Sequence, residues 1–592
     1  MNNNNLDPLR HSAAHLLAAA ITQLYPHALP TIGPAIENGF YYDFDNLEIS
    51  EKDFQKIEQK IHEIVKNWDG FEKIELSNDE ALKQWSNNPY KKELVEELIS
   101  KNEPITNYKS GEFVDLCRGG HVENSKEQLK YFKLLTVAGA YWRGEEKNKM
   151  LTRIYGTIFP TKQELDDYLK MLEEAKKRDH KKLGRELDLF TFSDKVGPGL
   201  ALWTPKGTLL RNLLDDYVWK LRKARGYQKV TIPHITKKDL YETSGHWAKF
   251  ANELFKIKSR EGHEFAMKPM NCPHHIQIFA HLPRSYRDMP QRYTETTMCY
   301  RDEQTGELSG LSRVRSFTQD DAHVFCTFDQ IKQEFNHVWD IIDQFYSSFG
   351  FDMRVRLSFH DPNNMKAYLG TEKAWEGAES VITSLAEERK PKYEVFKGIG
   401  EAAFYGPKID FMAKDSLGRE WQVATIQLDM NMPERFELTY TNANGEKDRV
   451  YMIHAAIMGS IERFLSILIE HYAGVFPLWL SPVQISLLPI SDLHVDFIKK
   501  YVIPALDKEN IRYELDAENK TIGNKIRQST LQKVPYMIII GEKEIEKSNI
   551  KDQKSKIEDI LVSVRTREGK DLGQVNLYEF INTLKDHIEK YE

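Results

Sequence analysis

Residues 299–326, CYRDEQTGELSGLSRVRSFTQDDAHVFC, are the stretch from which the fold can be argued. The segment predicts a strand, a glycine-containing loop and a returning strand. Arg301 and Glu303 are two residues apart, so on a strand they point to the same sheet face, and Arg313 and Arg315 follow on the returning strand. Arginines on an antiparallel pair could bind a polyphosphate through paired hydrogen bonds. A hairpin with a surface ladder of salt bridges explains the same residues equally well.

Two further segments lie on either side of this hairpin in the chain. Before it, an amphipathic helix predicted at about 206–224 leads into a strand at Gln228–Ile232 and then into Pro233. After it, VYMIHAAIMGSIERF at Val450–Phe464 predicts a strand, a turn of small residues and a helix that carries Arg463. In this order, the three segments resemble the three signature motifs of class II aminoacyl-tRNA synthetases.

The resemblance implies a fold and a set of partners. It implies an α+β multidomain protein whose catalytic domain is built on an antiparallel sheet. In that family the helix–strand–proline element forms a homodimer interface, the Arg-x-Glu hairpin binds ATP with Mg²⁺, and the last helix supplies a second arginine to ATP. The ATP-contact roles would fall to Arg301, Glu303, Arg313, Phe317 and Arg463.

Three separated residues of metal-binding type narrow the resemblance. Cys272, His323 and His454 are 51 and 131 residues apart, so there is no local zinc-finger spacing, and a buried thiol with two core histidines is the plain alternative. In the threonyl-tRNA synthetase family, which the chain resembles over nearly its whole length, one Cys and two His hold one Zn²⁺ in the amino-acid pocket. Three protein ligands leave an open position at zinc. By motif position, threonine-pocket roles would fall to Gln319, Asp321, Tyr405, Gln422 and Gln427.

Zinc in such a pocket suits the selection of threonine. Valine is nearly isosteric with threonine, and a site that engages the substrate hydroxyl can reject an analogue lacking it by roughly 10⁴–10⁵-fold. Serine keeps the hydroxyl and lacks one methyl, which is worth only about 10–200-fold. The resemblance therefore implies threonyl-adenylate formation, transfer to the 3′ end of tRNA(Thr), and a second site that hydrolyses Ser-tRNA(Thr).

The N-terminal part of the chain offers that second site. His11 and His15 are four residues apart and share one face of a helix predicted at 8–24, while Cys117 and His121 are spaced in the same way. A polar helix face explains HxxxH alone. HxxxH followed by CxxxH resembles the editing domain of threonyl- and alanyl-tRNA synthetases, which implies imidazole-assisted attack of water without an obligatory metal. Further editing-pocket positions are matched by Tyr42, Lys91 and Asp115.

The C-terminal part predicts a smaller α/β domain that binds RNA. Strands at Val483–Pro489 and Tyr536–Ile540 alternate with helices, including one at 521–533. Between Glu518 and Glu542 there are positive but no negative charges, which indicates either an RNA-facing patch or a solvated helix face. The resemblance implies anticodon contacts from Glu546 and Arg567.

Length and composition set the outer limits. The 592 residues, with 41% hydrophobic and 29% charged residues, predict a multidomain globular protein. A net charge of −7 excludes a wholly basic surface for nucleic acid, but not a local basic path. Four cysteines form no disulfide framework, and the absence of a signal peptide or an apolar span predicts a cytoplasmic protein that is not membrane-bound.

These patterns give the following domain boundaries. The charge-dense helical stretch from Thr161 contains neither Gly nor Pro up to Leu183, and it predicts a solvated linker helix. We expect an editing domain at 1–160, a linker helix at 161–184, a class II catalytic domain at 185–481 and an anticodon-binding domain at 482–592. Bacterial members of the family usually begin with a ubiquitin-like domain, which we expect to be absent here.

Two other functions account for part of the sequence. A zinc hydrolase that uses the N-terminal His/Cys group leaves the Arg-x-Glu hairpin and Arg463 unexplained. A non-catalytic tRNA-binding paralogue predicts damaged ATP residues, whereas the arginines of both later motifs are present. Seryl or prolyl synthetases do not explain Cys272, His323 and His454 together.

Overall fold

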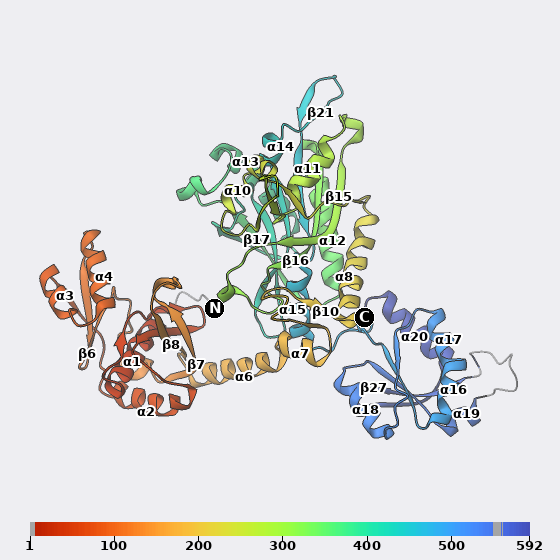
Figure 1. Cartoon of the computed structure of the whole chain (residues 1–592), viewed down its shortest axis with the longest axis horizontal. Coiled ribbons are helices and arrows are strands. Elements are labelled where there is room, and N and C mark those ends of the chain that lie inside the picture. Colours follow the sequence, from red (N-terminus) through yellow and green to blue (C-terminus); the bar gives the residue numbers. More distant parts are fainter. Residues whose placement is uncertain (1–5, 549–557, 559) are drawn as a thin grey trace. The chain divides into compact units, whose positions relative to one another are not determined.

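The computed structural model describes residues 6–548, 558 and 560–592, which form two compact units (Figure 1). One unit extends to Glu173, and the other begins at Glu174. The division falls within α6 (Lys162–Arg178), the charge-dense helix, which carries a single buried residue, Leu165.

The predicted single helix over 161–183 is wrong in one respect, because it is interrupted at Asp179. This residue has a non-helical backbone, and its side chain accepts a hydrogen bond from the Lys181 amide, so it caps a second helix, α7 (His180–Glu186). His180 and Leu183 are buried, so α7 packs into the second unit instead of lying in solvent.

The first unit is built around α1 (Asp7–Leu24), which is the predicted N-terminal helix. The helix is buried on most of its surface, because its small alanines let neighbouring segments of the same chain approach closely. It packs on α2 (Phe54–Val65) and on a five-stranded antiparallel sheet. Its polar side chains His15 and Ser12 are therefore held inside the protein. The sheet consists of β1 (Leu29–Pro30), β2 (Ala35–Ile36), β3 (Gly39–Asp45), β7 (Tyr131–Tyr141) and β8 (Met150–Phe159). A second, three-stranded sheet consists of β4 (Glu72–Leu76), β5 (Ile105–Ser110) and β6 (Phe113–Leu116).

The second unit contains an eight-stranded sheet in the order β11-β15-β16-β23-β20-β19-β17-β18. All pairs are antiparallel except the two at the edges, which confirms the expected antiparallel core. Long helices α8 (Pro205–Lys223), α12 (Ile331–Ser347) and α15 (Ile461–Tyr472) contribute to its largest hydrophobic core. The strands are β11 (Gln228–Lys229), β15 (Gln291–Tyr300), β16 (Ser316–Cys326), β17 (Asp352–Phe359), β18 (Glu394–Ile399), β19 (Lys408–Lys414), β20 (Glu420–Asp429) and β23 (Tyr451–Ala456).

The predicted Arg-x-Glu hairpin is present, but its strands are shorter than expected. Strand β15 ends at Tyr300 and β16 begins at Ser316, so Arg301, Glu303, Arg313 and Arg315 all lie in the connection. The connection remains compact because the amide of Arg301 donates to the carbonyl of Arg315 at 2.9 Å. Alternation along a strand therefore does not explain where these side chains point.

The helix and strand expected at a dimer interface also differ from the prediction: the strand is shorter, and the apolar side of the helix is buried within the chain. Only Gln228–Lys229 pair as a strand, and β11 is an edge of the sheet. The apolar side of α8, including Leu210, Leu214 and Val218, is buried in this chain's own core. Packing within one chain therefore accounts for the apolar side of α8, and a dimer needs other support.

The C-terminal domain is an α/β sheet with an unpredicted hairpin at one edge. Strands β25, β24 and β26 run parallel, β27 runs antiparallel to β26, and β28 runs antiparallel to β27, with helices packed around the sheet (Figure 1). Strand β28 and helix α19 are absent from the sequence-based expectation. The bounds are β24 (Ile485–Pro489), β25 (Tyr513–Leu515), β26 (Tyr536–Ile540), β27 (Leu561–Thr566), β28 (Asp571–Asn576), α18 (Ile522–Leu531), α19 (Glu542–Lys547) and α20 (Leu577–Glu589).

All four cysteines are buried free thiols. In the part of the chain that the structure describes, no helix is both long and apolar enough to cross a membrane.

Candidate functional site

Cys272, His323 and His454 meet in the interior of the catalytic domain. Cys272 is the first residue of α11 (Cys272–Ala280), while His323 and His454 are paired across β16 and β23. Each can offer one ligand atom, and these atoms lie within 4.8 Å of one another. His323 Nε2 is 3.0 Å from His454 Nδ1. Sheet register thus brings together residues that are far apart in sequence.

The outer nitrogens of both imidazoles already have partners. His454 Nε2 lies 2.9 Å from Asp429 Oδ2, and His323 Nδ1 lies 2.8 Å from His275 Nδ1. Such second contacts orient metal-binding imidazoles. Burial raises the pKa of the Cys272 thiol and lowers the pKa of His323, so without a cation these two groups are uncharged. One thiol and two imidazoles with their inner atoms facing each other are a donor set that fits zinc.

Three of the five residues assigned to threonine lie around this group. Asp321 Oδ2 accepts a hydrogen bond from Asn271 at 3.0 Å, and Asp321 Oδ1 lies 3.6 Å from His323 Nε2. The ring centre of Tyr405 is 5.1 Å from that of His454. Gln427 lies opposite His454 in the β20–β23 register.

The other two glutamines have different neighbours. Gln319 lies on β16, and its carbonyl accepts from the Cys299 thiol at 3.6 Å. The Gln422 amide instead donates to Asp410 at 2.8 Å, and its carbonyl accepts from Arg356 at 3.0 Å. Gln422 therefore belongs to a neighbouring polar cluster, and the structure shows no contact between it and the Cys/His group.

The Arg-x-Glu connection contains both a salt bridge and an arginine without an acidic partner among the described residues, the two features that the sequence predicted as alternatives. Arg313 Nε donates to Glu303 at 2.8 Å, which is the predicted salt bridge. Arg301 forms no such pair. Its guanidinium lies 5.1 Å from the ring centre of Phe317, and its Nε has no hydrogen-bond partner. On α15, burial alone lowers the pKa of Arg463, which stacks 5.9 Å from the Trp421 ring. Within the described residues, neither Arg301 nor Arg463 has an ion-pair partner, and both can bind an anion.

His246 is a buried residue near this pocket that the sequence analysis missed. It belongs to the short helix α10 (His246–Lys249), and Nδ1 contacts Ser244 Oγ at 2.9 Å while Nε2 has no hydrogen-bond partner. Burial lowers its pKa to about 3, so it is a neutral imidazole. Its ring centre is 6.2 Å from that of Tyr405. No spacing within the sequence marks it.

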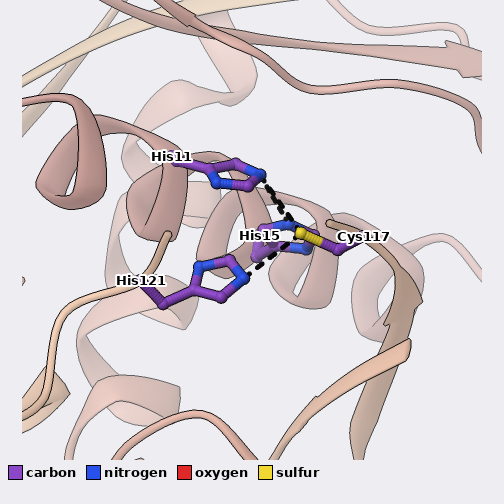
Figure 2. A group of neighbouring side chains, drawn as sticks. All are labelled: His11, His15, Cys117 and His121. Carbon is purple, nitrogen blue, oxygen red and sulfur yellow. Dashed lines mark hydrogen bonds between the residues drawn. The ribbon is translucent and has the colours of Figure 1, made fainter. Parts of the chain in front are cut away.

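The editing-type residues form a second Cys/His group, in the first unit (Figure 2). Cys117 Sγ is 3.4 Å from His11 Nε2 and 3.3 Å from His121 Nε2, and the two histidines of α1 are 3.2 Å apart. The amide of Gly119 also donates to Cys117 Sγ at 3.2 Å. The predicted four residues are thus brought together from α1 and from the loop after β6.

Two residues that the sequence did not indicate orient His121. Ser12 Oγ accepts from the Val122 amide at 3.1 Å and lies 3.2 Å from His121 Nδ1. Phe71 stacks on the His121 ring, with 4.0 Å between centres. These two contacts hold the ring with Nε2 toward the cysteine sulfur, 3.3 Å away. No spacing marks Ser12, because adjacent residues of a helix do not share a face.

A buried charge network stabilises the sulfur as thiolate. Burial disfavours the thiolate of Cys117, but hydrogen bonds from the three histidines lower the pKa of Cys117 to about 4. Burial also opposes protonation of His15, yet its bond to Asp115, 3.0 Å away, raises the pKa of His15 to about 9. Lys91 lies 2.6 Å from Asp115 and Tyr42 donates to it at 2.5 Å, which confirms that Tyr42, Lys91 and Asp115 are neighbours of the cluster.

This network lines a cavity of about 490 Å³. His11, His15 and Cys117 face it, together with Tyr42, Lys91 and aliphatic side chains such as Leu94 and Leu98. The cavity offers one reactive polar wall and one apolar wall, an arrangement typical of a small-ligand site.

The C-terminal candidates are more dispersed. Glu546 is exposed on α19, and Arg567 follows β27 and donates to the carbonyl of Phe476 at 2.9 Å. The basic patch predicted around 521–533 is partly wrong: Lys525 is buried and donates to the carbonyls of Pro489 and Asp516, and Lys520 pairs with Glu518. Burial of Lys525 follows from its helical spacing with Ser529, which is also buried.

Comparison with known proteins places these sites in a family. A family model described as "tRNA synthetase class II core domain (G, H, P, S and T)" matches residues 255–472, and one described as "Anticodon binding domain" matches residues 484–587. A third, "Threonyl and Alanyl tRNA synthetase second additional domain", matches residues 105–155, which include Cys117 and His121.

Similar proteins and structures agree with these matches. Threonine–tRNA ligases of Flavobacterium johnsoniae and Acetivibrio thermocellus are each 48% identical, over 98% and 99% of this chain and 88% and 89% of their own length. A structure titled as the RNA binding domain of threonyl-tRNA synthetase from Cryptosporidium parvum is 36% identical, with a TM-score of 0.63, covering 69% of this chain and 98% of that chain. The chain therefore belongs to the threonyl-tRNA synthetase family, the class II enzymes that ligate threonine to tRNA with ATP, and it includes the family's editing domain.

Proposed function

We propose that this ligase selects threonine at the buried group of Cys272, His323 and His454 and that the group holds one Zn²⁺. The observation that carries the proposal is the convergence of their three ligand atoms in a buried pocket. Bound zinc would supply Lewis-acid ligation of the amino and hydroxyl groups of threonine, which valine cannot match. Asp321, Tyr405 and Gln427 line the substrate beside it, and Gln319 and Gln422 complete the threonine-binding set.

Adenylation requires positioning and neutralisation of charge more than proton transfer. The carboxylate of threonine attacks the α-phosphate of ATP in line, and pyrophosphate leaves with Mg²⁺. Arg301 and Arg463, which have no ion-pair partner in the described part of the chain, neutralise the phosphates. The full ATP set is Arg301, Glu303, Arg313, Phe317 and Arg463.

A second proposal concerns hydrolysis of Ser-tRNA(Thr) in the 490 Å³ cavity of the editing domain. Water attacks the ester carbonyl, His11 takes its proton, and the proton is returned to the ribose oxygen as the ester bond breaks. Asp115 holds His15 as an imidazolium, which stabilises the developing oxyanion. Because the thiolate of Cys117 is balanced by this imidazolium, the cluster needs no metal ion.

The tRNA and assembly assignments are also proposals. Glu546 and Arg567 contact anticodon bases, and the domain limits are those set out above: 1–160, 161–184, 185–481 and 482–592. Two chains associate through the exposed edge strand β11 and the following segment to Pro233, just beyond which Ile235 is half exposed. Sedimentation of a chain of 69.1 kDa as a monomer only, at micromolar concentration, would exclude the dimer.

Threonine-dependent ATP–pyrophosphate exchange, with serine and valine alongside, tests the synthetic proposal. Activation of threonine and weaker activation of serine are expected, with valine rejected by roughly 10⁴–10⁵-fold. Comparable activation of valine would show that the pocket does not engage the hydroxyl. Deacylation of added Ser-tRNA(Thr) tests the editing proposal separately.

A further inference from the structure

His180, the first residue of α7, is buried, and no proposed step uses it. Its Nδ1 and its backbone amide lie 2.6 and 3.2 Å from Glu470 Oε1, and its Nε2 lies 3.0 Å from the backbone amide of Leu311. A backbone N–H can only donate, so Nε2 must accept, and the ring proton is on Nδ1. The imidazole is a neutral bridge that donates to one element and accepts from another.

The two bridged elements are those that carry the arginines assigned to ATP. Glu470 is on α15, seven residues after Arg463, so both lie on the same side of that helix two turns apart. Leu311 belongs to the connection between β15 and β16, two residues before Arg313. A single side chain therefore joins the helix of one ATP arginine to the loop of the other.

The loop is anchored at this point, in addition to the bonds from the Asp302 amide to the Glu253 carbonyl and from the Arg315 amide to the Gly199 carbonyl. Leu311 is fully buried in the main core, and Ser312 Oγ lies 3.0 Å from Ser466 Oγ on α15. Gly310 has φ +52°, and a Cβ added there would lie 2.2 Å from His180 Nε2, so the approach requires glycine. Three consecutive residues are thus fixed directly before the exposed side chain of Arg313.

The acidic partner is engaged through both of its oxygens. Glu470 Oε2 is paired with Arg419 at 2.6 Å, while Oε1 receives both bonds from His180. Arg178, just before α7, also donates to the carbonyl of His471 at 3.1 Å. The start of α7 is therefore attached to the end of α15 by several hydrogen bonds, some of them charge-assisted.

We propose that His180 is a positioning residue for ATP: it sets the distance between the Arg313 loop and the Arg463 helix. The inference rests on the ATP roles proposed above for those two arginines. Phosphate binding by two separate arginines depends on their spacing, and a misplacement of about 1 Å can cost about 10²-fold in rate. Loss of the bridge therefore weakens ATP binding without touching the threonine pocket.

Two near-isosteric substitutions separate the two bonds of the bridge. His180→Asn keeps a donor near the position of Nδ1 and removes the acceptor for Leu311. His180→Gln keeps an acceptor near the position of Nε2 and weakens the bond to Glu470. In pyrophosphate exchange, normalised to active sites titrated by adenylate burst, we expect His180→Asn to raise the KM for ATP about tenfold, a part of the 10²-fold limit for misplacement. The KM for threonine should not change, and His180→Gln should stay close to the parent.

Control variants distinguish positioning from a purely structural role. Gly310→Ala, which obstructs the same contact from the loop side, should also raise the KM for ATP, and combination with His180→Asn should be less than additive. If His180→Asn lowers only Tm and the fraction of active sites, with an unchanged KM for ATP per site, the inference is overturned. Arg313→Ala tests the underlying role: a normal KM for ATP in that variant refutes the proposed ATP set, whereas a raised value beside a normal His180→Asn refutes only the positioning role.

Discussion

The two Cys/His groups of this chain use the same side chains in opposite electrostatic settings. In the editing domain, Cys117 is surrounded by hydrogen-bond donors and a protonated His15, and its pKa falls to about 4. In the catalytic domain, burial raises the pKa of Cys272 and lowers that of His323. The first group contains its own compensating charge, whereas in the second group burial disfavours the charged forms of the thiol and of His323. Two groups of the same residue types therefore differ in the charge around the thiol.

The position of the nearest acidic residue explains the difference. Asp115 accepts from His15 and is itself balanced by Lys91, so the histidine becomes a cation beside the thiol. Asp429 contacts the outer nitrogen of His454, with the inner nitrogen directed at His323. This second arrangement prepares imidazoles to bind a cation that is not part of the chain.

The largest expected effect is loss of threonine activation in Cys272→Ser. Removal of the thiolate ligand should lower zinc content and reduce threonine-dependent pyrophosphate exchange by roughly 10⁴-fold, the scale of selection at a hydroxyl-binding site. Cys117→Ser is the matched control, and it should keep both zinc and activation. Zinc content by elemental analysis and exchange rates test the pair, and equal zinc loss in both variants would contradict the comparison.

Removal of both helix histidines should be the next largest effect. In His11→Ala/His15→Ala, deacylation of Ser-tRNA(Thr) should fall by about 10²–10⁴-fold, the usual contribution of general acid–base catalysis. Threonine activation should remain normal, because the two sites are in separate units of the chain. Deacylation at the parent rate would show that these histidines are not catalytic and form only a polar helix face.

A smaller effect is expected at the anticodon end. Arg567→Ala should raise the KM for tRNA(Thr), by about 10-fold for a base contact worth about 1–3 kcal/mol. Adenylate formation, which needs no tRNA, should be unchanged. Since Arg567 also donates to the carbonyl of Phe476, Tm is measured in parallel. An unchanged KM for tRNA would remove Arg567 from the anticodon set.

The smallest effect is a change in the shape of a pH profile. A thiol with a pKa near 9 is alkylated about tenfold faster for each pH unit between 5 and 8, because the thiolate is the reactive form. The pKa of Cys117 is lowered to about 4, so its thiolate is already formed at pH 5. Its alkylation rate by iodoacetamide, followed by mass spectrometry, should be nearly constant from pH 5 to 8. A tenfold rise per unit would contradict the ion pair with His15.

The sequence predicts those features of the two Cys/His groups that depend on residues close together in the chain. HxxxH on a helix, CxxxH in a loop and the three motifs identify the family and the antiparallel catalytic sheet, and they supply most of the candidate site residues. Local rules also mark α1 and α15 closely. The Asp179 cap was available as a signal, since Asp before a helix commonly marks an N-terminus, but the charge pattern on both sides concealed it.

The remaining features depend on tertiary packing. Sheet register places His323 opposite His454, and no sequence spacing encodes that pairing. Asp429, Ser12 and His246 gain their roles from neighbours that are distant in the chain. Packing also removes Lys525 from the predicted basic surface, because its ammonium group can be buried when two carbonyls accept hydrogen bonds from it.

Chelation of the parent enzyme tests the central difference between the two groups most directly. After dialysis against a zinc chelator, threonine-dependent pyrophosphate exchange and Ser-tRNA(Thr) deacylation are measured on the same sample, before and after zinc is restored. The account predicts that exchange is lost and then recovered with one zinc per chain, while deacylation is unchanged throughout. Loss of both activities, or retention of full exchange by zinc-free protein, would contradict it.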